Sequence, residues 1–402
     1  MVFLNKVRRV GSRVVIKFGG ADLSTGQKVS QAARMVAESG YKEVIVVVSA
    51  MGETTDDLLS AMSQIDNVSD EDYAEIVSMG ERVSARFFCA ALRARGMRAE
   101  LFDPSNPNWP LMTDSNFRNA KPDIEKTAEM TKTFIEPILG ASIPIVCGFL
   151  GKDRIGRTTC LGRGGSDTTA LLLAKCLGAD EVILVKETSG VLSADPRVVS
   201  DARPLNSMDI HEMFDLAQGG AKIVKPEALR YKLQNQRLRV VDFSTGDLSI
   251  GGTEITGSFD LESAEINSLQ DLLAINVVCE VKAENLREVF SALSQKPIYG
   301  VSSGRRSITV LTTDGNVSEV IGRLHDVKSF KAVSHREKVA MLQISHPTFI
   351  DSPGGVAAIS NALSHDGINI IEVTTSKATI NVFIEENQLN KAKEAISHVF
   401  TA

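Results

Sequence analysis

Paired cysteines, an excess of one charge and long apolar runs are all missing from this 402-residue sequence. Its cysteines are odd in number and have no CxxC spacing, which predicts buried thiols rather than disulfides or zinc ligands. The net charge of -6 offers no basic surface for nucleic acid or anionic lipid. No apolar stretch is long enough to span a membrane, and none follows the basic residues near the start as in a signal peptide. We therefore expect a cytoplasmic protein without a nucleic-acid partner, a membrane partner or a structural metal.

Hydrophobic residues make up 43% of a chain longer than one core usually supports, so two or more domains are expected. Within the first 260 residues, continuous apolar runs at 13–18, 43–50 and 181–186 are typical of strands covered on both faces. Further strands are predicted at 143–150 and 238–243, and apolar residues recur at helical spacing between the runs. This alternation predicts an α/β domain around a mostly parallel sheet.

The pattern changes in the last third of the chain. Residues 258–268 are acidic and polar, which predicts a linker. From Asp271 the order strand, helix, strand, strand, helix runs through twice, as in two small α+β sandwiches. We expect one large domain at 1–260 and two small ones at 270–330 and 331–402.

The first candidate site is a turn that follows the first predicted strand and contains Lys17, Gly19 and Gly20. Glycine lets backbone N–H groups approach an anion closely, and lysine adds a mobile positive charge, so the turn suits a phosphate group. The GxxxxGK[ST] spacing of a Walker loop is absent. A glycine pair after a strand is more often only a tight turn, so this motif alone is weak.

A sharper signal is the segment LGRGGSD at 161–167, which precedes an apolar helix predicted at 168–177. A helix N-terminus has free N–H groups and a positive partial charge, and an arginine beside it can bind a carboxylate through two hydrogen bonds. We expect Ser166 or Asp167 to cap this helix. Capping needs neither Arg163 nor three glycines, so an anion site is predicted as well.

Four other polar residues lie in glycine- or proline-containing segments. Glu81 ends the segment SMGE between two helical patterns, where a glutamate usually only favours the helix dipole but can also bind a substrate ammonium. Ser49 lies at the carboxyl end of a predicted parallel strand, where ligands bind in such sheets. Arg197 in GVLSADPR and Lys222 in GGAK could equally belong to surface turns.

Taken together and in order, these segments resemble the aspartate kinases. The similarity rests on VVIKFGG, VVVSAMG, SMGE, TTCLGRGGSDTTA, GVLSADPR and GGAKIVKP. The tail is similar too, since PGGV at 353–356 and DGINI at 366–370 look like the effector-binding pattern of ACT domains. The resemblance implies an amino-acid kinase fold, a mostly parallel sheet sandwiched by helices, followed by two ferredoxin-like ACT domains of βαββα order. It covers nearly the whole chain.

The resemblance also implies roles for individual residues. Lys17 and Lys222 would be catalytic and stabilise charge on the phosphoryl group in transfer. L-Aspartate would be held by Ser49, Glu81, Arg163 and Ser166, with Glu81 at its ammonium and Arg163 at a carboxylate. ATP with Mg²⁺ would contact a set of residues that partly overlaps the first: Lys17, Gly19, Gly20, Lys186, Glu187, Leu192, Arg197 and Lys222.

Regulation and assembly are implied in the same way. The product would be 4-phosphoaspartate, on the route to lysine, threonine and methionine, and lysine or threonine would be the feedback effector. The effector would contact residues of the two tail motifs: Pro353, Gly354, Gly355, Val356, Asn369 and Ile370. ACT domains usually pair across a dimer, so a homodimer or higher homo-oligomer is expected.

Several positions depart from the family pattern. Ala21-Asp22 stand where Thr-Ser is usual, and Lys186-Glu187-Thr188 where Thr-Asp-Val is usual. Leu192 replaces a tyrosine near the nucleotide, Lys225 replaces a histidine, and the first ACT unit lacks a clear PGV-type turn.

Two alternatives therefore stay open. One is a kinase of the same fold that acts on another carboxylate or on a carbamate, which Ala21-Asp22 keep possible. The other is a catalytically weak amino-acid sensor, against which the presence of Lys17, Glu81, Arg163 and Lys222 argues. A carboxylate is already a nucleophile at pH 7, so the reaction requires no general base and can rest on positioning and charge neutralisation.

Overall fold

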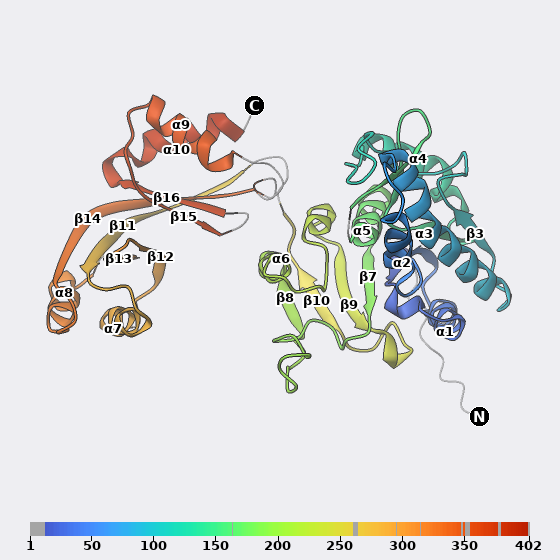
Figure 1. Ribbon diagram of the computed structural model, residues 1–402, viewed down its shortest axis with the longest axis horizontal. Coiled ribbons are helices and arrows are strands. Elements are labelled where there is room, and N and C mark those ends of the chain that lie inside the picture. Colours follow the sequence, from blue (N-terminus) through green and yellow to red (C-terminus); the bar gives the residue numbers. More distant parts are fainter. Residues whose placement is uncertain are drawn as a thin grey trace. The chain divides into compact units, whose positions relative to one another are not determined.

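The computed structural model describes residues 13–162, 164–259, 264–294, 296–313, 315–346, 349, 354–376 and 379–400. Two predicted site residues, Arg163 and Pro353, lie outside the described residues. The chain divides into two compact units, Met1–Phe259 and Asp260–Ala402, which are coloured blue to yellow and yellow to red in Figure 1.

The N-terminal unit is built on an eight-stranded sheet in the order β3-β4-β2-β1-β7-β9-β10-β8. Its strands are β1 (Arg13–Phe18), β2 (Glu43–Val48), β3 (Ala99–Phe102), β4 (Ile143–Cys147), β7 (Glu181–Lys186), β8 (Ser207–Asp209), β9 (Arg237–Asp242) and β10 (Thr253–Thr256). All neighbours are parallel except β9 and β10. Residues 14–18 and 44–48 are buried throughout, because both faces of the central strands are covered, as the continuous apolar runs predict.

Helices and one small hairpin complete this unit. The helices are α1 (Gly26–Ala37), α2 (Thr54–Met62), α3 (Asp70–Arg93), α4 (Ile124–Phe134), α5 (Gly165–Leu177) and α6 (Ile210–Gln218), and the hairpin is β5 (Leu150–Lys152) with β6 (Thr158–Cys160). The predicted strand at 143–150 ends early, at Cys147. Gly148 packs directly against Ser166, since a Cβ placed on the glycine would lie 2.6 Å from the Ser166 Cβ. The next residue, Phe149, takes a left-handed backbone conformation, so the strand does not continue.

One helix prediction is wrong. The two helical patterns that flank Gly80 form the single helix α3, and Glu81 lies in its middle rather than at a helix start. Gly80 does not break the helix but allows close packing, because a Cβ on it would lie 2.7 Å from the Cβ of Ala50. The glycine thus brings the middle of α3 against the loop that follows β2.

The C-terminal unit has a six-stranded antiparallel sheet in the order β12-β13-β11-β14-β16-β15. Its strands are β11 (Glu265–Val278), β12 (Ile298–Ser303), β13 (Ser307–Thr313), β14 (Ala332–Ser345), β15 (Ile370–Ser376) and β16 (Thr379–Glu385). Its helices are α7 (Ala283–Leu293), α8 (Val317–His325), α9 (Gly355–His365) and α10 (Leu389–Phe400). The twofold βαββα order is as predicted, but β11 begins at Glu265, inside the segment predicted to be a linker.

The two long strands β11 and β14 lie side by side at the centre of this sheet (Figure 1). Residues 272–278 of β11 pair with β13, and residues 339–345 of β14 pair with β16. The rest of each strand completes the sheet of the other half, since 265–269 pair with 341–345 and 274–278 pair with 332–336. Asp271 and Lys338 lie at the irregularity between these segments, both with positive φ, and form an ion pair at 3.1 Å.

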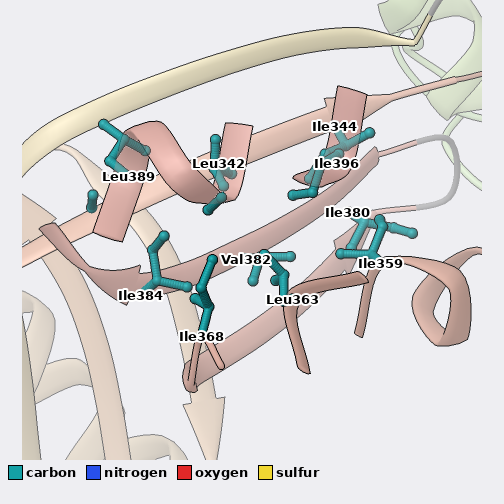
Figure 2. Close-up of a cluster of buried hydrophobic side chains, with 12 residues drawn as sticks. Leu342, Ile344, Ile359, Leu363, Ile368, Ile380, Val382, Ile384, Leu389 and Ile396 are labelled. Carbon is teal, nitrogen blue, oxygen red and sulfur yellow. The ribbon is translucent and has the colours of Figure 1, made fainter. Parts of the chain in front are cut away.

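Each half has its own apolar core between sheet and helices. In the second half, Leu342 and Ile344 of β14 pack with alternate residues of β16 and with Ile359, Leu363 and Ile396 of the helices α9 and α10 (Figure 2). In the first half, α7 and α8 cover the corresponding residues of β11 and β13. A further apolar cluster is made by strand residues that are adjacent in sequence to residues of these two cores, among them Leu272, Leu311 and Phe383. Because strand residues alternate in direction, this cluster belongs to the other face of the sheet.

Candidate active site

A cleft of about 390 Å³ opens at the carboxyl ends of β1 and β2, beside the start of α5. It is lined by five residues that the sequence predicts for the site: Lys17, Gly20, Ser49, Glu81 and Ser166. Segments far apart in the chain meet here because the carboxyl ends of neighbouring parallel strands share one edge of the sheet. The structure therefore brings residues predicted for phosphate and residues predicted for the substrate into one cleft.

The GRGGSD turn ends in a helix start without a side-chain cap. Helix α5 begins at Gly165, earlier than predicted, and its N-cap is Gly164 in a left-handed conformation with φ 77°. The prediction that Ser166 or Asp167 caps the helix is wrong, because Asp167 points to Lys17 and no side chain among the described residues caps this end. Gly164 also packs on Lys225, whose side-chain carbons lie 3.0–3.3 Å from a Cβ placed on the glycine. The uncapped N-terminus favours anion binding.

A buried cluster of charges lies beneath this turn. Asp167 Oδ1 is 2.8 Å from Lys17 Nζ, and its Oδ2 is 3.9 Å from Lys186 Nζ. Burial alone would raise the pKa of Asp167, but the two lysines and the Lys225 backbone N–H hold that pKa below its ordinary value. Burial lowers the pKa of Lys186 to about 8, although Asp167 opposes the shift. One carboxylate thus fixes two lysines at the ends of β1 and β7.

Glu81 is a buried carboxylate with half of its hydrogen-bonding capacity unused. Its side chain is 3% exposed, and Oε1 accepts the Ala50 N–H at 3.1 Å. Among the described residues, Oε2 has no hydrogen-bond partner. Burial raises the pKa of this carboxyl to about 7, an effect that the Ala50 N–H reduces. A cationic group entering the cleft would supply the missing partner.

The glycine turn after β1 is occupied by a neighbouring side chain. The Gly19 N–H donates to Asp22 Oδ2 at 2.9 Å, and Asp22 is 1% exposed. Burial raises the pKa of Asp22 to about 6, against the influence of the Gly19 N–H, Lys17 and Lys186. Gly20 lies against the loop after β2, since a Cβ on it would be 2.8 Å from the carbonyl oxygen of Ala50. The turn is therefore fixed from two sides.

Six of the eight residues predicted for the nucleotide do not line this cleft: Gly19 and Lys186, which lie in the turn and the charge cluster described above, and Glu187, Leu192, Arg197 and Lys222. Glu187 follows β7 and pairs with Lys28, and Leu192 is half-buried in a bridge with Pro204. Arg197 is exposed and pairs with Asp195 at 2.7 Å. Lys222 is exposed and near enough to Asp195 to contribute to its lowered pKa, which owes most to Arg197.

The segment that carries Lys222 is nevertheless tied to the cleft. Three residues farther on, the Lys225 backbone N–H donates to Asp167 Oδ2 at 3.1 Å. Lys222 is thus three residues from a backbone contact with the Asp167 cluster.

Several residues of the cleft were missed in the sequence. Tyr73, Arg118 and Phe149 line it, and the Arg118 guanidinium lies 4.4 Å from the centre of the Tyr73 ring. Arg118 lies in an irregular segment, so no periodicity marks it. Asp167, by contrast, belongs to the quoted GRGGSD motif, and the buried Lys17 that needs a counter-ion was a usable signal.

The predicted effector residues fall into two places in the C-terminal unit. Gly354 is the N-cap of α9 with φ 107°, and Gly355 and Val356 form its first turn. Asn369 and Ile370 lie at the start of β15 and line a pocket of about 420 Å³ together with residues of β11, β13 and β14. The α9 turn does not line this pocket.

In the part of the chain that the structure describes, no group of three His, Cys, Asp or Glu side chains could hold a metal ion. In the same part, no helix has the length and hydropathy needed to cross a membrane. All five cysteines are buried and unpaired.

Comparisons with known proteins identify the family. A model of the amino acid kinase family matches residues 12–242, more than half of the chain, and a model of the ACT domain matches 334–398. The aspartokinase of Corynebacterium glutamicum is 30% identical over 411 residues, which cover 96% of this chain and 96% of that protein. Aspartokinase 2 of Bacillus subtilis is 29% identical over 408 residues, with 96% and 97% covered.

Solved structures have the same fold. Aspartate kinase from Synechocystis matches with a TM-score of 0.72 at 22% identity, over 97% of this chain and 70% of that one. E. coli aspartokinase III in complex with aspartate and ADP (R-state) matches with a TM-score of 0.57 at 22% identity, over 96% and 99%. The same enzyme in complex with lysine and aspartate (T-state) gives 0.55 at 22% identity, over 96% and 98%. The predicted fold class is confirmed, and this chain belongs to the amino acid kinase family and, within it, to the aspartokinases.

Proposed function

We propose that this protein transfers the γ-phosphoryl group of ATP to the side-chain carboxylate of L-aspartate, giving 4-phospho-L-aspartate and ADP. The observation that carries the proposal is the buried Glu81 carboxylate with its unpartnered Oε2, which lines the same cleft as Lys17. Such a carboxylate suits the ammonium of an amino acid, and a lysine beside a glycine turn suits phosphate. The aspartate and ADP bound in the related E. coli enzyme support this pairing.

In the proposed reaction, Glu81 receives the substrate ammonium, while Ser49, Ser166 and the uncapped start of α5 lie along the same cleft. Arg163, between Gly162 and Gly164, is assigned to a substrate carboxylate, as the family resemblance implies. An oxygen of the side-chain carboxylate attacks the γ-phosphorus, the bond to the bridging oxygen breaks, and ADP leaves with that electron pair. Lys17, fixed by Asp167, stabilises the charge on the transferred group.

No general base is needed, since the attacking carboxylate is ionised at neutral pH. The single histidine of the N-terminal unit, His211, packs edge-on against Phe259 at the start of α6 and does not line the cleft. Catalysis by positioning and by fixed charge is sufficient for phosphoryl transfer of this kind.

For the nucleotide, we assign the charge of Lys186, Arg197 and Lys222 and the backbone of Gly19 and Gly20 to the phosphates, and Glu187 and Leu192 to the rest of ATP. The described residues offer no three-ligand metal cage. Mg²⁺ commonly needs only one or two protein carboxylates when phosphates supply its other ligands, so the ion would enter on ATP and neutralise phosphate charge. We assign no protein ligand to it.

The direct test is release of ADP from Mg-ATP across a panel of amino acids, other carboxylates and carbamates. Turnover with L-aspartate alone supports the proposal. Turnover with a different acceptor would favour the second kinase reading, for which Asp22 in place of a hydroxyl residue is the specific observation. Absence of turnover with every acceptor would leave an amino-acid sensor as the better account.

We further propose that the C-terminal unit binds lysine or threonine as a feedback inhibitor and joins two copies of the chain, with domains at 1–260, 270–330 and 331–402. The lysine complex of the E. coli relative supports an amino-acid effector. The pocket beside Asn369 and Ile370 supports an effector site in this unit. We also propose a cytoplasmic location, where aspartate and ATP are available. If neither amino acid changes activity or melting temperature, the unit serves assembly alone.

A further inference from the structure

Asp22 lies beneath the turn proposed to hold phosphate, and its chemistry is unusual for that place. It belongs to the short 3-10 helix Ala21–Leu23, is 1% exposed, and accepts the Gly19 N–H at 2.9 Å through Oδ2. Among the described residues its Oδ1 has no hydrogen-bond partner. A serine or asparagine could accept the same N–H without placing a charge in a buried site, so the hydrogen bond alone does not account for an aspartate here.

The surrounding charges explain why a carboxylate is present at this position. Lys17 of β1 and Lys186 of β7 bring two positive charges, and Asp167 of α5 balances one of them. Glu187, which follows β7, is paired with Lys28 of α1 and adds no net charge. One positive charge therefore remains in the buried cluster, and an ionised Asp22 neutralises it while holding the Gly19 N–H.

A bound nucleotide changes this balance. Phosphate brings its own negative charge to the lysines and needs the Gly19 N–H that Asp22 now accepts. Two anions would then share one small site, and one of them has to lose its charge or move away. Because the pKa of Asp22 is already raised to about 6, we expect Asp22 to lose its charge by taking up a proton.

We infer that Asp22 is a built-in counter-anion that competes with nucleotide phosphate for the Gly19 amide and the Lys17–Lys186 pair, so that binding of ATP takes up a proton. This rests on the proposed function, since it assumes that phosphate binds at the turn after β1. The expected result is a nucleotide affinity that falls with rising pH, as more Asp22 becomes ionised and has to be neutralised.

The test compares the wild type with Asp22→Asn, which keeps the shape and an acceptor for the Gly19 N–H but removes the charge. Calorimetry measures binding of the non-hydrolysable analogue AMP-PNP without aspartate, at pH 5.5 and pH 7, with and without Mg²⁺, because Lys186 with its pKa of about 8 stays mostly charged over this range. The two proteins should bind about equally at pH 5.5, and the variant should bind about tenfold more tightly at pH 7. Titration of the analogue itself cancels in the ratio.

Two further measurements sharpen the test. In buffers of different ionisation enthalpy at pH 7, where Lys186 is mostly charged, the wild type should take up about one proton more than the variant on binding. Asp66→Asn, an equal charge change at an exposed position between α2 and α3, should behave as the wild type.

A ratio of affinities that does not change with pH would overturn this inference alone. Weaker binding by Asp22→Asn only when Mg²⁺ is present would also overturn it, and would make Asp22 a ligand of the metal instead. No binding of AMP-PNP to any of the proteins would overturn the proposed function as well.

Discussion

The ammonium of Lys17 lies 2.8 Å from the carboxylate of Asp167, and each side chain is only 6% exposed. The lysine is thus held in place before any ligand arrives, by a residue at the start of α5. A buried ion pair of this kind adds little net stability, but removal of one partner leaves the other charge uncompensated. Its value is orientation, because a group that is already in position needs no rearrangement during transfer.

Lys17→Ala should lower kcat by about a hundredfold or more, the scale of a preorganised electrostatic group. The readout is the rate at saturating aspartate and ATP. Lys17→Ala leaves the buried charge of Asp167 without its partner, which could disturb the fold. The double variant Lys17→Met/Asp167→Asn removes that charge as well, so it should fold normally and still be equally slow. Lys42→Ala, on the exposed loop before β2, is the control. A folded Lys17 variant with near-normal kcat would end the catalytic assignment.

Glu81→Ala should raise KM for aspartate strongly and leave KM for ATP nearly unchanged. Loss of the carboxylate leaves the substrate ammonium unpaired in a partly dry cleft, which costs roughly 2–5 kcal/mol by analogy with buried pairs. Initial rates with each substrate varied in turn measure the effect. Equal changes in both KM values would point to distortion of α3 and of the Ala50 loop instead.

Glu81 should also make stability depend on pH. Its folded-state pKa of about 7 exceeds the ordinary 4.5, so its contribution to the free energy of unfolding is full below pH 4.5 and is lost as pH rises through 7. Glu81→Gln should therefore be more stable than the wild type at pH 8, by about 2–3 kcal/mol, and no more stable at pH 4.5. Denaturant unfolding at the two pH values measures this. A difference independent of pH would refute the assignment of the shift to Glu81.

Gly80→Ala should destabilise the N-terminal unit by about 1–3 kcal/mol, because the added methyl group meets Ala50. The displaced loop should weaken aspartate binding too. The matched control is Gly26→Ala in α1, where an added Cβ has nothing within 4 Å, and which should be neutral or stabilising by up to about 1 kcal/mol. Similar behaviour of the two variants would show that the close packing is unimportant.

Gly354→Phe should relieve inhibition by lysine or threonine and leave the uninhibited kcat unchanged. The N-cap of α9 has φ 107°, which is strained for any side chain, so the turn and its free N–H groups should shift. Dose–response curves for both amino acids give the readout. Gly322→Ala, in the exposed middle of α8, should keep normal inhibition. Unchanged inhibition in Gly354→Phe would remove this turn from the effector site.

The sequence predicted best where periodicity or spacing has one physical cause. The strands β1 and β7 were predicted to the residue, since continuous apolar runs arise when both faces are covered. Gly80 was misread because a glycine that allows close packing looks the same in sequence as one that ends a helix. The β11 start was missed because its first residues are only partly buried, so they carry no apolar pattern.

The candidate site, too, could be predicted from the sequence only in part. GRGGSD indicated the helix start, but Asp167 does not cap the helix because it pairs with Lys17, which lies far away in sequence. Arg118 and Tyr73 enter the cleft from an irregular loop and from the first turns of α3, and only the folded chain brings them together.

The shared use of β11 and β14 has a consequence for synthesis on the ribosome. The first sandwich cannot close before β14 has emerged, because residues 332–336 form its last strand. The second must wait for β16 and α10, yet it closes on residues 265–269, made before any other strand of the unit. The first half therefore cannot finish folding when its own sequence, 270–330, is complete, and excision of 331–402 would remove residues 332–336 from its sheet.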